Sequence, residues 1–587
     1  MASAKKKPLK YIFVVGGVMS GVGKGVASSS IGKLLQARGF TVTAVKIDPY
    51  VNVDAGTMNP TEHGEVFVLD DGMECDQDMG NYERFLGVDL SSKNYMTTGS
   101  VYQAVITRER NLEYGGKCVE VVPHIPLEVI GRIDAAAANE KADVITIEIG
   151  GTVGEYQNLL FLEALRMLKL KKPDDVIAVL VSYLPMMGND SEQKTKPTQY
   201  AVRTLNASGV QPDFILARAS MPIDKKRKEK IAFNCNVREE DVISAPDVAS
   251  IYEVPANFEK DHLSDLILEK LHLTSRGTDL KEWRALAERI QGLKTPVRIG
   301  MVGKYFGTGD FILADSYISV IEAVKHAAYA VGRKPVIEWL NAEDYDPETN
   351  KKFSEKLAEL KNFDGIVVPG GFGSRGVEGK INVIKFCREE KIPYFGLCYG
   401  MQLLTVEFAR HVAGLGGANT TEVNPKTAHP VIDILPEQKK NMREKNYGAT
   451  MRLGAYPAVL VEGTIAHDAY NNSVIASDGA SSSLRGAPQS GATKALPAGR
   501  QESHISVHKI SERHRHRYEV NPEYVERLEK SGLVFSGSSP NRELMEIAEL
   551  PKSKHPFFLG TQFHPEFKSR PLAPHPLFLA FVKAAAK

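Results

Sequence analysis

The sequence lacks an excess of charge of either sign. Its 587 residues include 73 Lys and Arg against 72 Asp and Glu, so the formal net charge at pH 7 is +1. Proteins that attract nucleic acid or an anionic membrane over a broad surface carry an excess of positive charge. This chain has no such excess. We therefore expect no nucleic acid and no membrane as partner, and any anionic ligand must be bound by a local site.

Cysteine is scarce, with five residues in the whole chain, and no two of them have a metal-binding spacing. An odd number in so long a chain fits a reducing compartment rather than a disulfide framework. We therefore expect a cytoplasmic protein. The five are Cys75, Cys118, Cys235, Cys387 and Cys398.

Long apolar runs are missing as well. The basic start "MASAKKKPLK" is followed by an apolar stretch that stops at Gly16 and Gly17. Such a stretch is too short for a signal-peptide core or a membrane span. We interpret residues 11–15 as a buried strand.

What the chain does contain is two series of short apolar runs separated by helix-like segments. The length favours two or more domains, since one core rarely extends beyond roughly 300 residues. Buried strands that alternate with helices form parallel sheets. The sequence thus predicts an α/β fold with two doubly wound parallel-sheet domains in tandem. The runs lie at 40–47, 142–151, 174–184 and 212–220, and then at 297–305, 334–340, 363–371 and 392–400.

The boundary between the two series lies at residues 275–296, a polar amphipathic helix between a Gly and a Pro. This composition is typical of a linker, so we expect domains at 1–274 and 297–587. Residues 477–504 are rich in Ser, Ala, Gly and Pro and cannot offset their ordering entropy by burial. We expect a flexible surface insertion there, with a short helix packed on the domain as the alternative.

The stretch "YIFVVGGVMSGVGKGVASSS" (11–30) runs from the predicted strand through a glycine-rich turn into small residues. In such a unit the N–H groups of the turn and of the helix N-terminus converge and can bind triphosphate oxygens. Lys24 adds a positive charge, but Gly25 stands where the common motif has a Ser or Thr that holds Mg²⁺. The sequence predicts an ATP-binding loop, and a purely structural turn is the alternative.

If ATP binds at this loop, the magnesium ion needs oxygen ligands from elsewhere. Glu148 closes the apolar run "VITIEIGG", and open α/β sheets bind their ligands at such strand ends. Asp78 belongs to the acidic stretch "DDGMECDQDMGNYERF". We therefore predict Asp78 and Glu148 as magnesium ligands, although a solvated acidic loop would explain 70–78 equally well.

A second anion could bind to the loop "SEQKTKPTQ" (191–199), which follows a predicted strand. The loop gathers two cations and two polar side chains, and a solvated turn is the alternative. These side chains are Lys194, Lys196, Thr198 and Gln199.

The C-terminal half carries a different chemistry, beginning at "YFGLCYGMQ" (394–402). Cys398 follows an apolar run and has Gly396 and Gly400 two residues away on either side. A nucleophile on a sharp strand-to-helix turn needs small neighbours, and a helix N-terminus favours its thiolate. We predict Cys398 as a nucleophile, with a buried structural thiol as the alternative.

A cysteine nucleophile needs a base, and "TQFHPEF" (561–567) offers His564 with Glu566 two residues later. Residues two apart on a strand share a face, so Glu566 can orient the imidazole as in other catalytic triads. Taken alone, His564 could be a core histidine. The acyl intermediate also needs fixed N–H donors for its oxyanion, and we predict those of Gly371 in "VPGGFGSRG" and of Tyr399.

Five blocks in fixed order resemble the CTP synthase family: "GGVMSGVGKG", "KIDPYVNVDAGTMNPTEHGEVFVLDDG", "GNYERF", "EIGGTVGE" and "KTKPTQ". The later Cys and His-Pro-Glu resemble class I glutamine amidotransferases over 297–587. The resemblance implies a P-loop, dethiobiotin-synthetase-like amidoligase fused to an amidotransferase. It also implies that ATP phosphorylates the 4-oxygen of UTP and that ammonia, from glutamine or supplied directly, displaces the phosphate to give CTP.

The same resemblance implies Mg²⁺ as cofactor, GTP as allosteric activator, CTP as feedback inhibitor and a homotetramer. A closed route for ammonia would connect the two sites, and His63 matches a position near it. Matching the motifs places ATP at Gly21, Val22, Gly23, Lys24, Gly25, Val26, Asp78, Asp247 and Val248. It places UTP or CTP at Ser20, Lys194, Thr195, Lys196, Pro197, Thr198, Gln199 and Lys230, and glutamine at Gly371, Tyr399, Gln402, Glu422 and Arg517. Without the resemblance, the run 513–517 could be a basic surface patch.

One motif departs from the family. After "GGTVG" the family usually has Asp-Ile-Glu, whereas this chain has Glu155, Tyr156 and Gln157. We still assign these three residues to the UTP/CTP site and expect the change to affect inhibition by CTP more than turnover.

Two other functions stay open from the sequence. Another ATP-dependent glutamine amidoligase, such as a cobyrinic acid a,c-diamide synthase, would share both domain types, but "KTKPTQ" and "DPYVNVDAG" argue against it. A nucleotide-switched scaffold would leave Cys398, His564 and Glu566 without a task.

Overall fold

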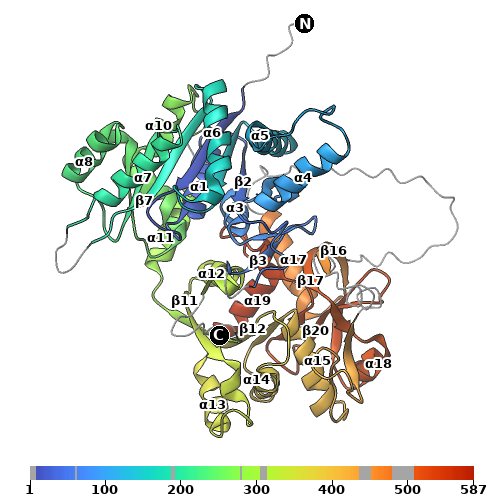
Figure 1. Ribbon diagram of the computed structural model, residues 1–587. Helices are drawn as coiled ribbons and strands as arrows, with labels where there is room; N and C mark the ends of the chain where they lie inside the picture. The colour runs from blue at the N-terminus through green and yellow to red at the C-terminus, as the bar shows by residue number, and fades with distance from the viewer. Residues whose placement is uncertain are drawn as a thin grey trace, which may run out of the picture. The chain divides into compact units, whose positions relative to one another are not determined.

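The computed structural model describes residues 8–59, 63–186, 192–277, 280–304, 314–434, 451–478 and 508–587. The chain divides into two compact units (Figure 1), Met1–Leu293 with Arg570–Ala573, and Lys294–Ser569 with Pro574–Lys587. In the predicted linker, α11 (Lys281–Gly292) is amphipathic and buries Trp283, Leu286 and Ala287. Most of the predicted insertion, from 479 on, lies outside the described residues, and its first two residues end α17 (Ile465–Asp478).

A seven-stranded sheet forms the centre of the first unit, and all its neighbouring strands pair in parallel. This confirms the parallel sheet and the strands predicted around 11–15, 40–47, 142–151, 174–184 and 212–220. The order is β5 (Tyr95–Thr97), β2 (Val42–Asp48), β6 (Val144–Ile149), β1 (Lys10–Gly16), β7 (Val176–Tyr183), β8 (Phe214–Ala219) and β9 (Val242–Pro246).

Both faces of this sheet are covered by helices. Tyr11, Phe13 and Val15 of β1 join a buried cluster with one set of helices. Ile12 and Val14, which alternate with them and point to the other face, are also fully buried. The cluster face is covered by α4 (Thr98–Arg110), α5 (Val121–Asn139), α6 (Leu159–Lys171), α7 (Lys196–Ala207) and α8 (Lys225–Cys235). Also in this unit are α1 (Lys24–Ala37), α3 (Asp78–Leu86), α9 (Val254–Phe258), α10 (Leu263–Lys270) and the hairpin of β3 (Val66–Val68) and β4 (Glu74–Asp76).

The second unit has a nine-stranded sheet whose first five strands are parallel, as predicted. They are β11 (Lys334–Asn341), β10 (Pro296–Gly303), β12 (Gly365–Val368), β13 (Tyr394–Leu397) and β21 (Phe558–Thr561). The sheet then continues with four antiparallel strands that we did not predict. They are β20 (Met545–Glu549), β19 (Val534–Ser538), β16 (Arg452–Leu460) and β17 (Lys509–His516).

Helices again cover both faces of this sheet. Phe395 and Leu397 of β13 belong to a buried cluster with α12 (Ile318–Ala330) and α19 (Pro576–Ala585). Tyr394 belongs to a second cluster with α14 (Val377–Glu390) and α15 (Tyr399–His411). The remaining elements are α13 (Phe353–Glu359), α18 (Pro522–Lys530) and a small sheet of β14 (Asn419–Thr420), β15 (Pro430–Ile434) and β18 (Tyr518–Val520). Among the described helices of the chain, each is too short or too polar to cross a membrane.

Candidate active sites

The predicted phosphate loop connects β1 to α1, as the sequence indicated. Its main chain turns through left-handed conformations at Val18, Gly21 and Gly23, with φ angles of 77°, 70° and 88°. Gly23 is the N-cap of α1. A Cβ at Gly23 would lie 2.6 Å from Nη1 of Arg218, so the position needs glycine for space as well as for its φ angle.

Lys24, the first residue of α1, lies buried beneath this loop. Its Nζ donates a hydrogen bond of 2.9 Å to the carbonyl of Gly151, in the turn after β6. Burial lowers the pKa of Lys24, and the charge of Glu148 partly opposes that shift. A phosphate group bound at the loop would bring a negative charge close to this amine and raise its pKa again.

Asp78, the first residue of α3, occupies the space beside Gly25. A Cβ at position 25 would lie 2.1 Å from Oδ1 of Asp78. No Ser or Thr can therefore stand at position 25 without displacing this carboxylate. The structure thus explains why the loop lacks the usual hydroxyl: a carboxylate oxygen lies in its place.

Asp78 and Glu148, the predicted magnesium ligands, converge on the ammonium group of Lys46. Lys46 Nζ forms ion pairs with Asp78 and, at 2.9 Å, with Glu148. The hydroxyl of Tyr82 donates to the other oxygen of Glu148. Lys46 was missed by our sequence analysis, although a lysine inside a fully buried strand such as β2 is an unusual feature.

Two further carboxyl groups belong to this cluster. Asp48 and Asp76 lie 3.7 and 3.9 Å from Lys46 Nζ. Burial raises the pKa of Asp48 to about 6 and that of Asp76 to about 8, against the opposing charge of Lys46. Burial and the charge of Asp78 also raise the pKa of Glu148. With a pKa of about 8, Asp76 is mostly protonated at pH 7, whereas Lys46 lowers the pKa of Asp78 against the effect of burial and keeps it ionised.

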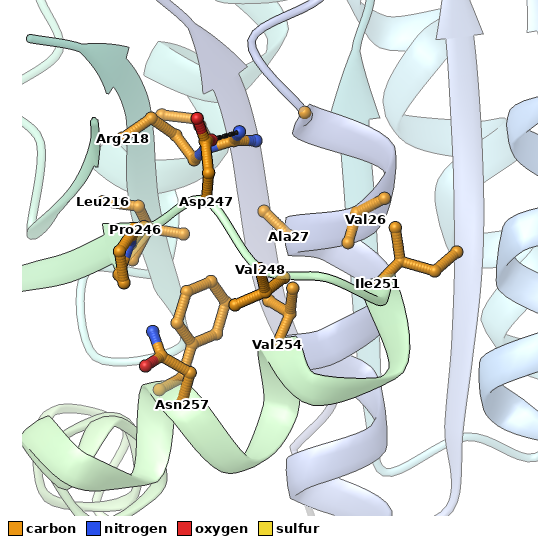
Figure 2. Close-up of a pocket in the computed structure, with 14 residues that line it drawn as sticks. Val26, Ala27, Leu216, Arg218, Pro246, Asp247, Val248, Ile251, Val254 and Asn257 are labelled. Carbon is orange, nitrogen blue, oxygen red and sulfur yellow. Dashed lines mark hydrogen bonds and ion pairs between the residues drawn. The ribbon is translucent and has the colours of Figure 1, made fainter. Parts of the chain in front are cut away.

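A pocket of about 190 Å³ opens beside the phosphate loop (Figure 2). Its walls are mostly apolar, and the predicted ATP contacts Val26, Asp247 and Val248 are among its lining residues. Figure 2 shows the one ion pair drawn there, between Arg218 and Asp247, with N and O 2.6 Å apart. An apolar pocket of this size next to a phosphate loop suits a flat heteroaromatic ring. The apolar lining includes Ala27, Leu216, Ile251, Val254 and Phe258.

The residues predicted to bind UTP or CTP are less clearly gathered. Thr198 is buried and accepts a hydrogen bond of 2.8 Å from Ser182, so its hydroxyl is engaged within the protein. Lys194 forms an ion pair with Glu192, and Gln199 donates to Thr195 at 3.1 Å. By contrast, the residues Ser20, Lys196, Tyr156, Gln157 and Lys230 are exposed. Their joint role stays a prediction.

Two further predicted residues in the first unit have defined neighbours. The carboxylate of Glu155 lies over the turn after β6, where its Oε2 would be 2.6 Å from a Cβ at Gly151. Gly151 is the residue whose carbonyl accepts from Lys24, so Glu155 lies near the phosphate loop. His63 packs edge-on against Tyr50, with ring centres 5.2 Å apart.

In the second unit, Cys398 stands at the sharp turn between β13 and α15. Its main chain has φ 49° and ψ −99°, and its N–H donates to the carbonyl of Thr561 at 2.6 Å. A non-glycine residue in such a conformation is strained and is typical of nucleophile turns. The sulfur lies 3.9 Å from the carbonyl of Arg515 and 3.7 Å from Nε2 of Gln562.

The two glycines that flank Cys398 are required by space. A Cβ at Gly396 would lie 2.7 Å from the main-chain carbon of Gly400. A Cβ at Gly400 would lie 2.3 Å from the carbonyl oxygen of Val368 in β12. Small residues are therefore needed on either side of Cys398, because a side chain at Gly396 would meet helix α15 and one at Gly400 would meet the neighbouring strand β12.

His564 lies next to Cys398 and is held by Glu566. Its Nδ1 is 2.7 Å from Oε1 of Glu566, and its ring stacks on Phe567 with centres 5.1 Å apart. A Cβ at Gly370 would be 3.0 Å from Cε1 of His564 and 3.8 Å from Cβ of Cys398. The structure thus brings the three predicted catalytic residues together.

The charge of Glu566 and the nearby Cys398 outweigh the effect of burial on His564. Burial lowers the pKa of this imidazole, but the two neighbours raise it to about 10. At neutral pH His564 therefore carries a proton, which can pass to a leaving amine.

The predicted glutamine contacts surround the same turn. Glu422 accepts a hydrogen bond of 2.6 Å from the N–H of Gly373, and burial raises the pKa of its carboxyl. The Tyr399 hydroxyl donates to the carbonyl of Gly373 at 2.9 Å. Gln402 is buried and donates to the carbonyl of Tyr518 at 2.9 Å. The bonds of Glu422 and Tyr399 to Gly373 hold the glycine turn 370–373, which contains the predicted donor Gly371.

The run 513–517 is not a basic surface patch, because Arg513, His514 and His516 are buried. His514 and His516 share a hydrogen bond of 2.9 Å, and both were missed by our sequence analysis. The carbonyls of this strand face the catalytic residues: that of Arg513 accepts from the N–H of His564 at 2.8 Å. Arg517, the predicted glutamine contact, is partly exposed.

A phosphate loop with paired carboxylates in one unit and a Cys-His-Glu arrangement in the other define the class of glutamine-dependent amidoligases. Comparison with known proteins agrees: residues 10–273 match the family described as CTP synthase N-terminus, and residues 312–584 match glutamine amidotransferase class-I. A CTP synthase of Methanococcus maripaludis is 47% identical over 578 residues, which cover 98% of this chain and 99% of the relative. This chain therefore belongs to the CTP synthase family.

Two further similarities extend this comparison. A CTP synthase of Caldanaerobacter subterraneus is 47% identical over 576 residues, 98% of each chain. Among solved structures, the glutaminase domain of Trypanosoma brucei CTPS with bound acivicin is 34% identical. It covers 49% of this chain and 94% of its own, with a TM-score of 0.40.

Proposed function

We propose that this protein forms CTP from UTP, using ATP and ammonia released from glutamine. The observation that carries the proposal is the joint presence in one chain of two chemistries. The first is the Lys24 loop with Asp78 and Glu148, and the second is the Cys398, His564 and Glu566 arrangement. An enzyme that only bound ATP would not need a cysteine nucleophile, and an enzyme that only hydrolysed glutamine would not need a phosphate loop. A glutamine-dependent ligase needs both.

In the amidotransferase unit, the Cys398 thiolate attacks the amide carbon of glutamine, and the oxyanion that forms is bound by the N–H groups of Gly371 and Tyr399. His564 donates its proton to the leaving nitrogen, which departs as ammonia. Water then hydrolyses the thioester to glutamate, with His564 as general base. Glu422, Gln402 and Arg517 are the proposed contacts of glutamine.

In the ligase unit, the loop 17–23 and Lys24 bind the ATP phosphates, and the pocket at Val26, Asp247 and Val248 holds the adenine. The γ-phosphoryl group passes to the 4-oxygen of UTP, and ammonia then displaces phosphate at that carbon. UTP is proposed to lie at 194–199 with Ser20, Lys230 and the 155–157 turn. The same residues would bind CTP as an inhibitor.

Asp78 and Glu148 would hold the magnesium ion through their carboxylate oxygens, which they would share with the ammonium group of Lys46. Mg²⁺ usually takes one or two carboxylates and completes its shell with water and substrate phosphates. Among the described residues no set of three or more His, Cys, Asp or Glu is arranged to hold a metal. When bound, the ion would neutralise phosphate charge during transfer.

The finer properties that family membership implies are part of the proposal. They are activation by GTP, inhibition by CTP, assembly as a homotetramer, a cytoplasmic location and domain limits at 1–274 and 297–587. Other glutamine amidoligases are less favoured because the "KTKPTQ" block would then lack a function, and the nucleotide-switched scaffold is less favoured because the triad would lack one.

Two assays on the full chain test the proposal. We expect glutamate release from glutamine and, separately, ATP hydrolysis that depends on UTP. A scaffold would release no glutamate, and another amidoligase would hydrolyse ATP without regard to UTP. Either result would refute CTP formation as the function.

A further inference from the structure

Lys380, on α14, is a buried amine of the amidotransferase unit to which the proposed chemistry gives no role. Its exposed fraction is 0%. Its Nζ has no hydrogen-bond partner among the described residues. A buried polar group without a partner is costly to fold, so a charge-bearing side chain at this position calls for an explanation.

The amine of Lys380 faces the two residues that supply the proposed oxyanion donors. Its Nζ lies 3.8 Å from the position of a Cβ at Gly371. It also lies 5.4 Å from the centre of the Tyr399 ring. Helices α14 and α15 pack against each other, which holds Lys380 behind the glycine turn. The Gly371 position is bordered too by Lys304 and by the Tyr399 ring, each at 3.9 Å.

The surroundings of Lys380 favour its neutral form until an anion appears. Burial, and to a lesser extent the charge of Lys304, lowers the pKa of Lys380 to about 7. An oxyanion on Gly371 and Tyr399 would raise that pKa again, because an opposite charge favours the protonated amine. Such an interaction is weakly screened in a buried site.

We propose that Lys380 is a positioning residue of the glutaminase site: a buried counter-charge that supports the Gly371 main chain and stabilises the oxyanion bound by Gly371 and Tyr399. The inference rests on the proposed glutamine hydrolysis. In that reaction the bond between Cys398 and the amide carbon forms while the carbonyl π electrons move to oxygen. The carbon–nitrogen bond then breaks, with the proton from His564. Lys380 forms no bond in either step.

The test compares Lys380→Met, which keeps the length of the side chain, and Lys380→Gln, which keeps a polar end, with the wild type. The matched control is Ile384→Val, a buried position on the same helix. Three quantities are measured on the full chain: kcat and KM for glutamine hydrolysis, CTP formation with ammonium, and inhibition by the γ-aldehyde analogue of glutamine. This aldehyde adds the thiol of Cys398 and places its oxygen where the oxyanion forms.

Both Lys380 variants should lower kcat about tenfold or more and weaken binding of the aldehyde by a similar factor. KM for glutamine and the ammonium-dependent rate should stay at the wild-type values, as should every value for Ile384→Val. A merely structural role would instead lower the ammonium-dependent rate or raise KM.

Unchanged kcat and aldehyde inhibition in either variant would overturn the inference. So would a parallel loss of ammonium-dependent CTP formation in both, since Lys380 would then only support the fold. If the wild type releases no glutamate, the proposed function itself is refuted. Failure of the proposed function can therefore be distinguished from failure of the inference about Lys380.

Discussion

The carboxylate of Asp78 lies where a side chain at residue 25 would begin, with Oδ1 only 2.1 Å from the position of a Cβ on Gly25. The two residues are therefore interdependent. The glycine leaves room for a carboxylate, and the carboxylate supplies the oxygen that the loop lacks.

The first prediction concerns that carboxylate. Asp78→Asn keeps its shape but removes the charge, so UTP-dependent ATP hydrolysis should fall on the order of 10²-fold or more, as expected when a metal ligand is lost. Glutamine hydrolysis should persist, because Cys398 lies in the other unit. Glu113→Gln, an exposed carboxylate of the same unit, serves as the control. Normal CTP production in Asp78→Asn would refute the metal assignment.

The second prediction concerns Gly25. Gly25→Ser adds the hydroxyl of the common phosphate loop, yet it should lower ATP-dependent CTP formation rather than support it, because the new side chain displaces Asp78. The measurement is CTP formation with ammonium at varied magnesium concentration. Wild-type rates and magnesium dependence in Gly25→Ser would show that the contact with Asp78 is unimportant.

The third prediction uses the raised pKa of His564. Glu566→Gln removes the carboxylate that raises it, so the imidazolium should lose its proton at a lower pH and kcat for glutamine should fall about 10²-fold or more. The rate at which a small alkylating reagent modifies Cys398, followed from pH 5 to 10, reports the thiolate. An identical pH profile in wild type and variant would contradict the role of Glu566.

The same shift affects stability. A histidine whose pKa is about 10 in the folded protein and 6.5 as its ordinary value stabilises the fold fully below pH 6.5, and this contribution is lost as the pH rises through about 10. Urea unfolding of the amidotransferase unit should therefore become easier over that window in the wild type. In His564→Gln the decline should be smaller, and equal declines would contradict the assigned pKa.

The fourth prediction concerns the turn at Cys398. Gly400→Ala places a methyl group 2.3 Å from the carbonyl oxygen of Val368, and overpacking of this kind costs about 1–3 kcal/mol. Thermal unfolding should shift to lower temperature and glutamine hydrolysis should be lost. Gly416→Ala is the control, since a Cβ at that position meets nothing within 4 Å. Equal melting temperatures for both variants would disprove the steric argument.

The parts of the fold that could be predicted from sequence are those where local signals are strong. Parallel strands such as β1 are buried on both faces and are therefore continuously apolar, and Cys398 and His564 each follow such a strand. The antiparallel strands were missed because their sequences are mixed: β16 alternates between buried and partly exposed residues, and β20 is buried along its length but includes two glutamates, Glu546 and Glu549.

Local sequence signals also failed to predict the charged residues inside the sites. Lys46, Arg218 and Lys380 are separated in sequence from the groups they face, so only the fold brings them together. A lysine in a sequence is usually exposed; the apolar run around Lys46 is a local signal for a buried lysine, but it does not show which carboxylates that lysine faces.

The central claim is that Cys398 supplies nitrogen to a ligase site that can also use free ammonia. The most direct measurement is CTP formation from UTP, ATP and magnesium, with either glutamine or ammonium as nitrogen donor, in the wild type and in Cys398→Ala. We predict that the wild type uses both donors and that the variant loses the glutamine reaction while keeping the ammonium reaction. Glutamine-dependent CTP formation in Cys398→Ala, or loss of both reactions together, would contradict the account.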